Sequence, residues 1–97
     1  MPNRVTCHPG EILREEFLDP LGMSVNALAM ALRVPATRIG AIVKEERSVT
    51  ADTALRLGRF FGTSAEFWMN LQAMHDLTKT RKESGISIER DVNPRAA

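Results

Sequence analysis

Residues 24–44 read SVNALAMALRVPATRIGAIVK, and their pattern decides the fold. Leu28, Ala29 and Leu32 fall on one face of a helix, and Ala29 is small where a second helix must approach closely. Pro35 cannot sit inside a helix, so it breaks this pattern, which restarts at Ile39. The stretch therefore predicts two short helices joined by a tight turn, the arrangement that places a second helix in the major groove of DNA.

The exposed face of the second predicted helix suits contacts with DNA better than it suits a core. It carries Thr37, Arg38, Ala41 and Lys44. Residues 33–59 hold six basic side chains against three acidic ones, which is the electrostatic footprint of a DNA-binding surface. Two alternatives stay open: a helical corner that never meets DNA, and a charged face that is merely solvated.

Length and composition favour one all-helical domain. The chain has 97 residues, of which 43% are apolar and 26% charged, and it has no tyrosine and few β-branched runs. No apolar run is long enough to span a membrane, and the N-terminus lacks the apolar stretch of a signal peptide. The single cysteine, Cys7, allows no internal disulfide and fits a reducing compartment, so we expect a cytoplasmic protein.

The expected N-caps Ser24, Thr50 and Ser64, together with helix breakers, divide the chain into an all-α, five-helix domain at residues 8–80, a flexible leader at 1–7 and a polar tail at 81–97. Asp19-Pro20-Leu21-Gly22 should end the first helix, and Gly85 should break any helix in the tail. Residues 86–89 alternate apolar and polar side chains, which suits a short strand against a partner or a frayed tail. The helices are expected at about 9–18, 24–32, 36–44, 51–61 and 64–80.

The last predicted helix carries a long apolar stripe that a core of this size cannot hide completely. Part of the stripe should therefore be a dimer or partner surface, although Phe67 and Trp68 could equally fill the core of the monomer. The candidate dimer residues are Trp68, Leu71, Met74 and Leu77.

The sequence offers no arrangement of residues for catalysis or metal binding. Cys7 and His8 are adjacent, but His75 is distant and no metal-ligand spacing links them. Adjacent carboxylates such as Glu15 and Glu16 point about 100° apart on a helix, so they do not form an acid/base pair. We therefore expect no enzyme activity, no cofactor and no metal.

Four stretches of the chain resemble one particular family. HPGEILREEFLDPLGMS at 8–24, ALAMALRVPATRI at 27–39 and TADTALRLGRFFGTSAEFWMNLQ at 50–72, followed by MHDL at 74–77, are similar to the HigA antitoxins. These belong to the Cro/C1-type helix-turn-helix group and have a compact lambda-repressor-like fold. The resemblance implies an antitoxin that neutralises a RelE/HigB-like ribonuclease toxin. It also implies a homodimer that binds operator DNA and represses its own operon.

The resemblance also implies which residues contact DNA. Bases would be read from Ala36, Thr37 and Ala41, with Arg38 beside them as our candidate for the main specificity donor. Phosphates would be held by Ser24 and Asn26 at the start of one helix and by Lys44 at the end of the next.

This chain departs from the family pattern at several positions. Arg33 stands where a glycine is usual in the turn, so the turn should be either distorted or strained by a left-handed arginine. Val25 and Ala41 replace longer polar side chains, and Glu45 and Glu46 lie near the expected phosphates. Two alternative functions therefore remain: a stand-alone repressor without a toxin, or a toxin-binding module with weakened DNA affinity.

A surface for the toxin can be suggested from charge alone. RelE-like toxins are basic, and residues 11–19 hold four carboxylates against one arginine. The candidate toxin-binding residues are Glu11, Glu15, Glu16 and Asp19.

Overall fold

A computed structural model describes residues 8–96, and within that range the chain is helical with no strand. The predicted leader at 1–7, with Cys7, lies outside the described residues. Three consecutive segments form the first helix: α1 (Pro9–Ile12), the π-helical η2 (Leu13–Leu18) and α2 (Asp19–Leu21). Four more helices follow, which are α3 (Val25–Leu32), α4 (Ala36–Val43), α5 (Ala51–Phe61) and α6 (Ala65–Asp91). The prediction of an all-α fold with five helices is confirmed.

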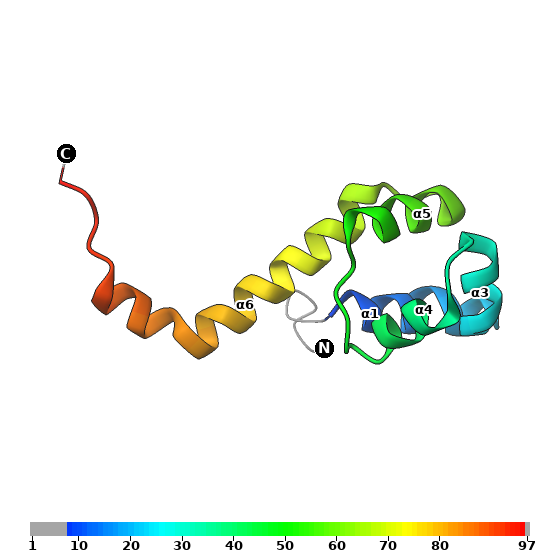
Figure 1. Cartoon of the computed structure of the whole chain (residues 1–97), viewed down its shortest axis with the longest axis horizontal. Coiled ribbons are helices and arrows are strands. Elements are labelled where there is room, and N and C mark those ends of the chain that lie inside the picture. Colours follow the sequence, from blue (N-terminus) through cyan, green and yellow to red (C-terminus); the bar gives the residue numbers. More distant parts are fainter. Residues whose placement is uncertain (1–7, 97) are drawn as a thin grey trace.

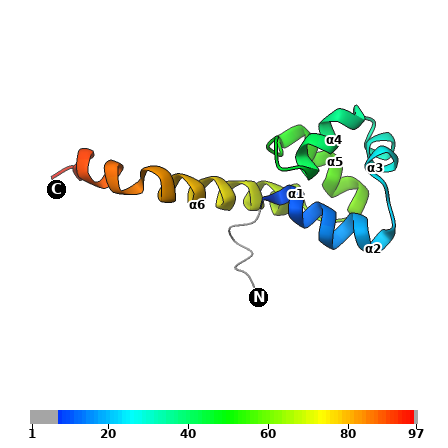
Figure 2. The ribbon, with the colours of Figure 1, turned by 90° about the horizontal axis from the view of Figure 1, so that it is seen from below.

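The helices pack around one core, and α6 projects from it (Figures 1 and 2). The side chains of Leu13, Leu28, Ile39, Leu57 and Trp68 are fully buried, so every helix contributes to this core. Within residues 8–96, no helix is both long and apolar enough to cross a membrane.

The first helix continues past the residue at which the sequence predicted its end. Asp19, Pro20 and Leu21 are helical, and the chain leaves the helix only at Gly22, whose φ is 61°. Just before Pro20 the turn widens, because the Asp19 N–H donates to the carbonyl oxygen of Arg14, five residues earlier. A proline clashes with the carbonyl four residues before it in a regular helix, and a π-turn relaxes that spacing.

The prediction for the C-terminal tail was also wrong. Helix α6 runs without interruption to Asp91, so Gly85 does not break it and residues 86–89 are helical rather than extended. One glycine costs a helix only about 1 kcal/mol relative to alanine, which its neighbours can offset. In the turn that contains Gly85, the Ser87 hydroxyl donates to the Ser84 carbonyl oxygen at 3.2 Å.

Caps begin three of the helices at the predicted residues. The side-chain oxygens of Ser24, Thr50 and Ser64 accept bonds from backbone N–H groups in the first turns of α3, α5 and α6. Gly62 ends α5 in the left-handed conformation, with φ of 77°.

Candidate nucleic-acid interface

Helices α3 and α4 form the predicted helix-turn-helix. The two helices pack against each other, and Leu32 of α3 and Ile42 of α4 are both buried in the hydrophobic core. Arg33 ends α3 with φ of 62° and ψ of 44°, so of the two alternatives for this turn the structure has the left-handed arginine. The Val34 N–H then donates to the Ala29 carbonyl oxygen at 3.0 Å, which closes the turn before α4 begins.

The exposed side of α4 brings together most of the residues expected to read DNA. A shallow hollow of about 350 Å³ is lined by Ala36, Thr37, Gly40, Ala41, Lys44 and Glu46. Its floor is made of small side chains, while Lys44 and Glu46 supply opposite charges at one end. The start of α3 lies close by, since a Cβ at Gly40 would stand 3.9 Å from a Val25 methyl carbon. Ser24 and Asn26 flank that valine and are exposed.

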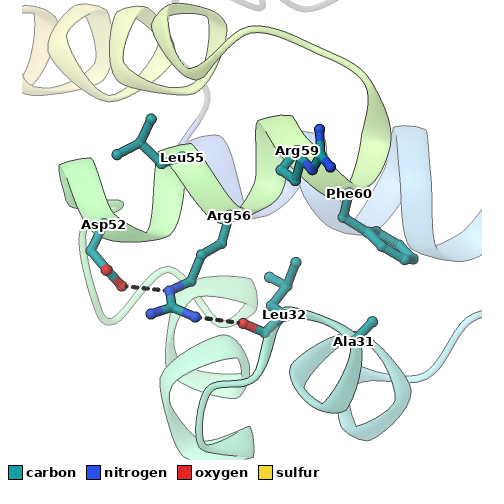
Figure 3. A pocket seen from close by; sticks show the side chains of 7 residues that line it. All are labelled: Ala31, Leu32, Asp52, Leu55, Arg56, Arg59 and Phe60. Atoms are coloured by element: carbon teal, nitrogen blue, oxygen red, sulfur yellow. Dashed lines mark hydrogen bonds and ion pairs between the residues drawn. The ribbon is translucent and has the colours of Figure 1, made fainter.

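Arg38 does not join this group. Its Nη1 donates to Asp52 Oδ2 at 2.7 Å, and about a quarter (26%) of its side chain is exposed. The same oxygen accepts a bond from Arg56 Nε at 3.0 Å, and Arg56 Nη1 donates to the Leu32 carbonyl oxygen at 2.8 Å (Figure 3). Hydrogen bonds from Arg56 and then from Arg38 hold the pKa of Asp52 below its usual value. Asp52 therefore stays charged and ties α4, α5 and the end of α3 together.

The bonds of Asp52 to the two arginines were not predicted from the sequence. Its partners are of two kinds. Arg56 lies four residues along the same helix, a spacing that does indicate an ion pair. Arg38 lies fourteen residues away on another helix, and no local pattern connects it with Asp52.

The other end of α4 rests on the first helix. Arg14 Nη1 donates to the Val43 carbonyl oxygen at 2.8 Å, and Arg14 Nη2 lies 4.0 Å from Glu45. Gly10 lies so close to the Ile42 carbonyl group that a Cβ there would overlap the oxygen. Glu45 itself has φ of 65°, so a second non-glycine residue is left-handed directly after α4.

Comparison with known proteins places this arrangement in a family. The helix-turn-helix family matches residues 13–68. Virulence-associated protein I of Dichelobacter nodosus is 55% identical over 76 residues, which are 78% of this chain and 70% of that protein. Antitoxin HigA-1 of Vibrio cholerae is 38% identical over 72 residues, 74% of this chain and 68% of that protein. The chain belongs to the HigA family of helix-turn-helix antitoxins.

Solved structures of other HigA proteins have the same fold along almost the whole chain. The Pseudomonas aeruginosa antitoxin HigA, solved with the higBA promoter, has a TM-score of 0.90 at 48% identity, covering 94% of this chain and 99% of that one. A Coxiella burnetii addiction module antidote protein of the HigA family has a TM-score of 0.88 at 51% identity, covering 93% and 98%.

The four candidate toxin-binding carboxylates of this HigA chain all lie on the first helix. Glu15, Glu16 and Asp19 are exposed, whereas Glu11 is half-buried. Arg14 lies among them, with its Nη2 3.6 Å from a Glu15 carboxylate oxygen. The predicted acidic surface is therefore present, although one of its four members is partly covered.

The predicted dimer residues separate into two groups. Trp68 is fully buried, its Nε1 donates to Thr63 Oγ1 at 2.8 Å, and its ring centroid lies 5.1 Å from that of Phe17. It fills the core of the monomer, so its prediction as a dimer residue was wrong. Leu71 is half-buried against the same core, while the side chains of Met74 and Leu77 remain largely exposed.

Proposed function

We propose that this HigA chain is an antitoxin that binds the operator of its own operon as a homodimer and represses it. The supporting observation is the exposed side of α4, where residues of the expected DNA-reading positions surround one hollow. The P. aeruginosa relative that shares this fold at 48% identity was solved with the higBA promoter. We further propose that the chain acts in the cytoplasm without enzyme activity.

Within the interface, we propose that Ala36, Thr37 and Ala41 contact base edges, because they line the hollow on α4. Ser24, Asn26 and Lys44 would contact phosphates, since they are exposed around it. Arg38 has a different role in this proposal. Its guanidinium is bonded to Asp52, so it positions α4 against α5 rather than reading a base.

A substitution distinguishes these two roles of Arg38. We expect Arg38→Ala to weaken binding to the operator and to a scrambled duplex by similar factors, because the recognition helix loses its attachment to α5. A selective loss of base preference at one operator position would instead identify Arg38 as a base reader, where one good arginine–guanine contact contributes roughly 1–3 kcal/mol.

The toxin partner follows from the family and from charge. We propose that a basic RelE/HigB-like ribonuclease toxin docks on the acidic first helix, mainly through the exposed Glu15, Glu16 and Asp19. Replacing Glu15 and Glu16 by lysine should weaken the toxin complex and reduce its dependence on salt. Unchanged toxin binding would place the docking surface elsewhere.

The test of operator binding is a fluorescence-anisotropy titration against the DNA upstream of the gene and against a scrambled duplex, at two salt concentrations. We expect operator binding roughly 10³-fold tighter than binding to the scrambled duplex, with a steep salt dependence. Equal, weak binding to both duplexes would refute the repressor function.

That outcome would favour a second candidate function, a toxin-binding module with weakened DNA affinity. One observation supports it: Glu46 lines the hollow on α4, where its carboxylate would repel phosphates. Co-purification with the toxin in the absence of operator binding would identify this function. A stand-alone repressor would instead bind the operator and have no toxin encoded beside it.

A further inference from the structure

One side of the projecting part of α6 carries a short basic stripe (Figures 1 and 2). His75, Lys79 and Lys82 recur at four- and three-residue steps, so they lie on one face of the helix. With Thr78 they line an open hollow of about 540 Å³. Both lysines are exposed, and neither forms an ion pair with any described residue. Within that part of the chain, the stripe therefore presents two positive charges that no carboxylate neutralises.

This stripe is continuous with the proposed DNA-reading surface of α4. A second hollow, of about 190 Å³, joins α6 to the loop that follows α4, and Glu46, His75 and Lys79 are among the residues that line it. Glu46 also lines the hollow on α4, and the other two also line the hollow on α6. Because the three hollows share residues, they form one track that runs from α4 to Lys82, which we call the α4–α6 track.

The two ends of the α4–α6 track are held in a fixed relation by buried contacts. Gln72 Oε1 accepts a hydrogen bond of 2.8 Å from the N–H of Val49, in the loop after α4. Three residues further along α6, the His75 ring packs edge-on against the buried ring of His8, with the two centroids 4.9 Å apart. Since α6 is one continuous helix, these contacts also set the direction in which the stripe leaves the domain.

The α4–α6 track is positive at both ends and acidic in its middle. Lys44 is exposed at the end of α4, Lys79 and Lys82 are exposed at the far end, and Glu46 lies between them. This distribution suits two separate contacts with a polyanion, because phosphates over the middle part would be repelled. DNA that lies on α4 is such a polyanion, and its backbone continues beyond the bases that α4 reads.

We propose that Lys79 and Lys82 bind backbone phosphates of the DNA that flanks the operator half-site. Lys82 lies ten residues beyond Gln72, which is about 15 Å along α6 or roughly four base pairs of DNA. Helix α6 thereby extends the contact beyond the helix-turn-helix and strengthens binding without reading bases. The inference rests on the proposed function, because it adds a second phosphate-binding segment to the same operator complex.

The first test uses two nested duplexes from the DNA upstream of the gene. The short duplex ends at the bases that α4 reads, and the long one continues for roughly six base pairs beyond them, enough to reach Lys82. On the long duplex, Lys79→Ala/Lys82→Ala should lower the slope of log affinity against log salt by about two units, since each phosphate contact contributes about 0.9. On the short duplex, the slopes of the variant and the wild type should be equal.

Two neighbouring residues supply a matched control. Arg81 and Lys82 are both exposed and carry the same charge, but adjacent residues of a helix point about 100° apart, so Arg81 lies off the stripe. We expect Lys82→Ala to lower the salt slope on the long duplex by about one unit and Arg81→Ala to leave it unchanged. The helical circular dichroism and the mass from sedimentation equilibrium should match the wild type for both variants, because neither side chain is buried.

Ethylation interference locates the phosphates themselves. An ethylated phosphate has lost its negative charge, so ethylation of the flanking phosphates should weaken binding of the wild type. The same modification should leave the Lys79→Ala/Lys82→Ala variant unaffected, because the side chains that bind those phosphates are already gone.

The failures of the two proposals give different results. Equal salt slopes for Lys82→Ala and Arg81→Ala overturn the flanking contact, since only general charge would then matter. A double variant that loses the same affinity on both duplexes overturns it too, because the change would act on the fold or the assembly. A double variant that binds both duplexes normally but loses the toxin assigns the stripe to a protein partner instead. A wild type that binds operator and scrambled DNA equally refutes the proposed function itself.

Discussion

Gly10 is the residue at which the smallest substitution should have the largest effect. It lies in the first turn of the first helix, and its Cα faces the carbonyl group at the end of the recognition helix α4. A Cβ added there would overlap the Ile42 oxygen and stand 2.8 Å from the Ile42 carbonyl carbon. The obstacle is backbone, which cannot rotate away as a flexible side chain would.

The expected size of the effect follows from two opposing contributions. Overpacking of a well-packed site costs about 1–3 kcal/mol and occasionally more. Because backbone must move here, we expect the upper end of that range. Alanine regains roughly 1 kcal/mol of helix propensity relative to glycine. Gly10→Ala should therefore lower the free energy of unfolding by about 2 kcal/mol, which corresponds to a fall in Tm of roughly 8–16 °C for a chain of this length.

The chain supplies a matched control in Gly85. A Cβ there would meet only the Arg81 Cβ at 3.8 Å, an ordinary van der Waals contact. Gly85→Ala should thus leave the Tm unchanged or raise it slightly, through helix propensity alone. Thermal unfolding followed by circular dichroism measures both variants. If Gly10→Ala melts at or above the wild-type Tm, the close approach of the first helix to α4 does not exist as described.

Three further predictions concern single side chains. Burial, and then the neighbouring His75, hold the pKa of His8 below its ordinary value of 6.5, so the unfolded chain binds more protons than the folded one. The free energy of unfolding in urea should be at its full value above about pH 6.5 and should fall as the pH decreases towards the lowered pKa of His8. Because Asn can still cap α1, His8→Asn should make the free energy of unfolding depend less on pH. Lys44→Ala should reduce the slope of log affinity against log salt by about one unit in operator titrations without altering base preference, and an unchanged slope would remove Lys44 from the interface. Arg33→Gly should raise the Tm, because relief of about 1–2 kcal/mol of left-handed strain exceeds the roughly 0.5–1 kcal/mol entropic cost of glycine. Glu45→Gly tests the second left-handed position in the same way. A lower Tm in both variants would contradict the strain argument.

The features that were predicted correctly depend on short-range interactions. Ser24, Thr50 and Ser64 cap their helices because a side-chain oxygen needs only the N–H three residues later. The turn at Arg33 was predicted because the family uses glycine at that position, and the left-handed backbone is what such a glycine permits. These residues carry their own structural signal, so one sequence is sufficient to interpret them.

The features that were missed depend on what surrounds a residue in space. Trp68 fits an apolar stripe whether it faces the core or a partner, and only the packing of Phe17 around it decides for the core. Pro20 and Gly85 are helix breakers by propensity, yet a π-turn accommodates the first, and the second costs only about 1 kcal/mol within a long continuous helix. Arg38 is basic and lies on the recognition helix, but the position of Asp52 on another helix determines where its guanidinium points.

The projection of α6 divides one helix between two regimes of stability. Trp68 and Gln72 are its buried residues, the His75 ring lies 4.9 Å from the His8 ring, and beyond about residue 80 most side chains are exposed. Backbone amides near Trp68 can exchange with solvent only when the whole domain unfolds, whereas those beyond about residue 80 need only local fraying. In the monomer, the boundary of the cooperative folding unit therefore lies inside a continuous helix, and hydrogen exchange should reveal it as a gradient of protection along α6.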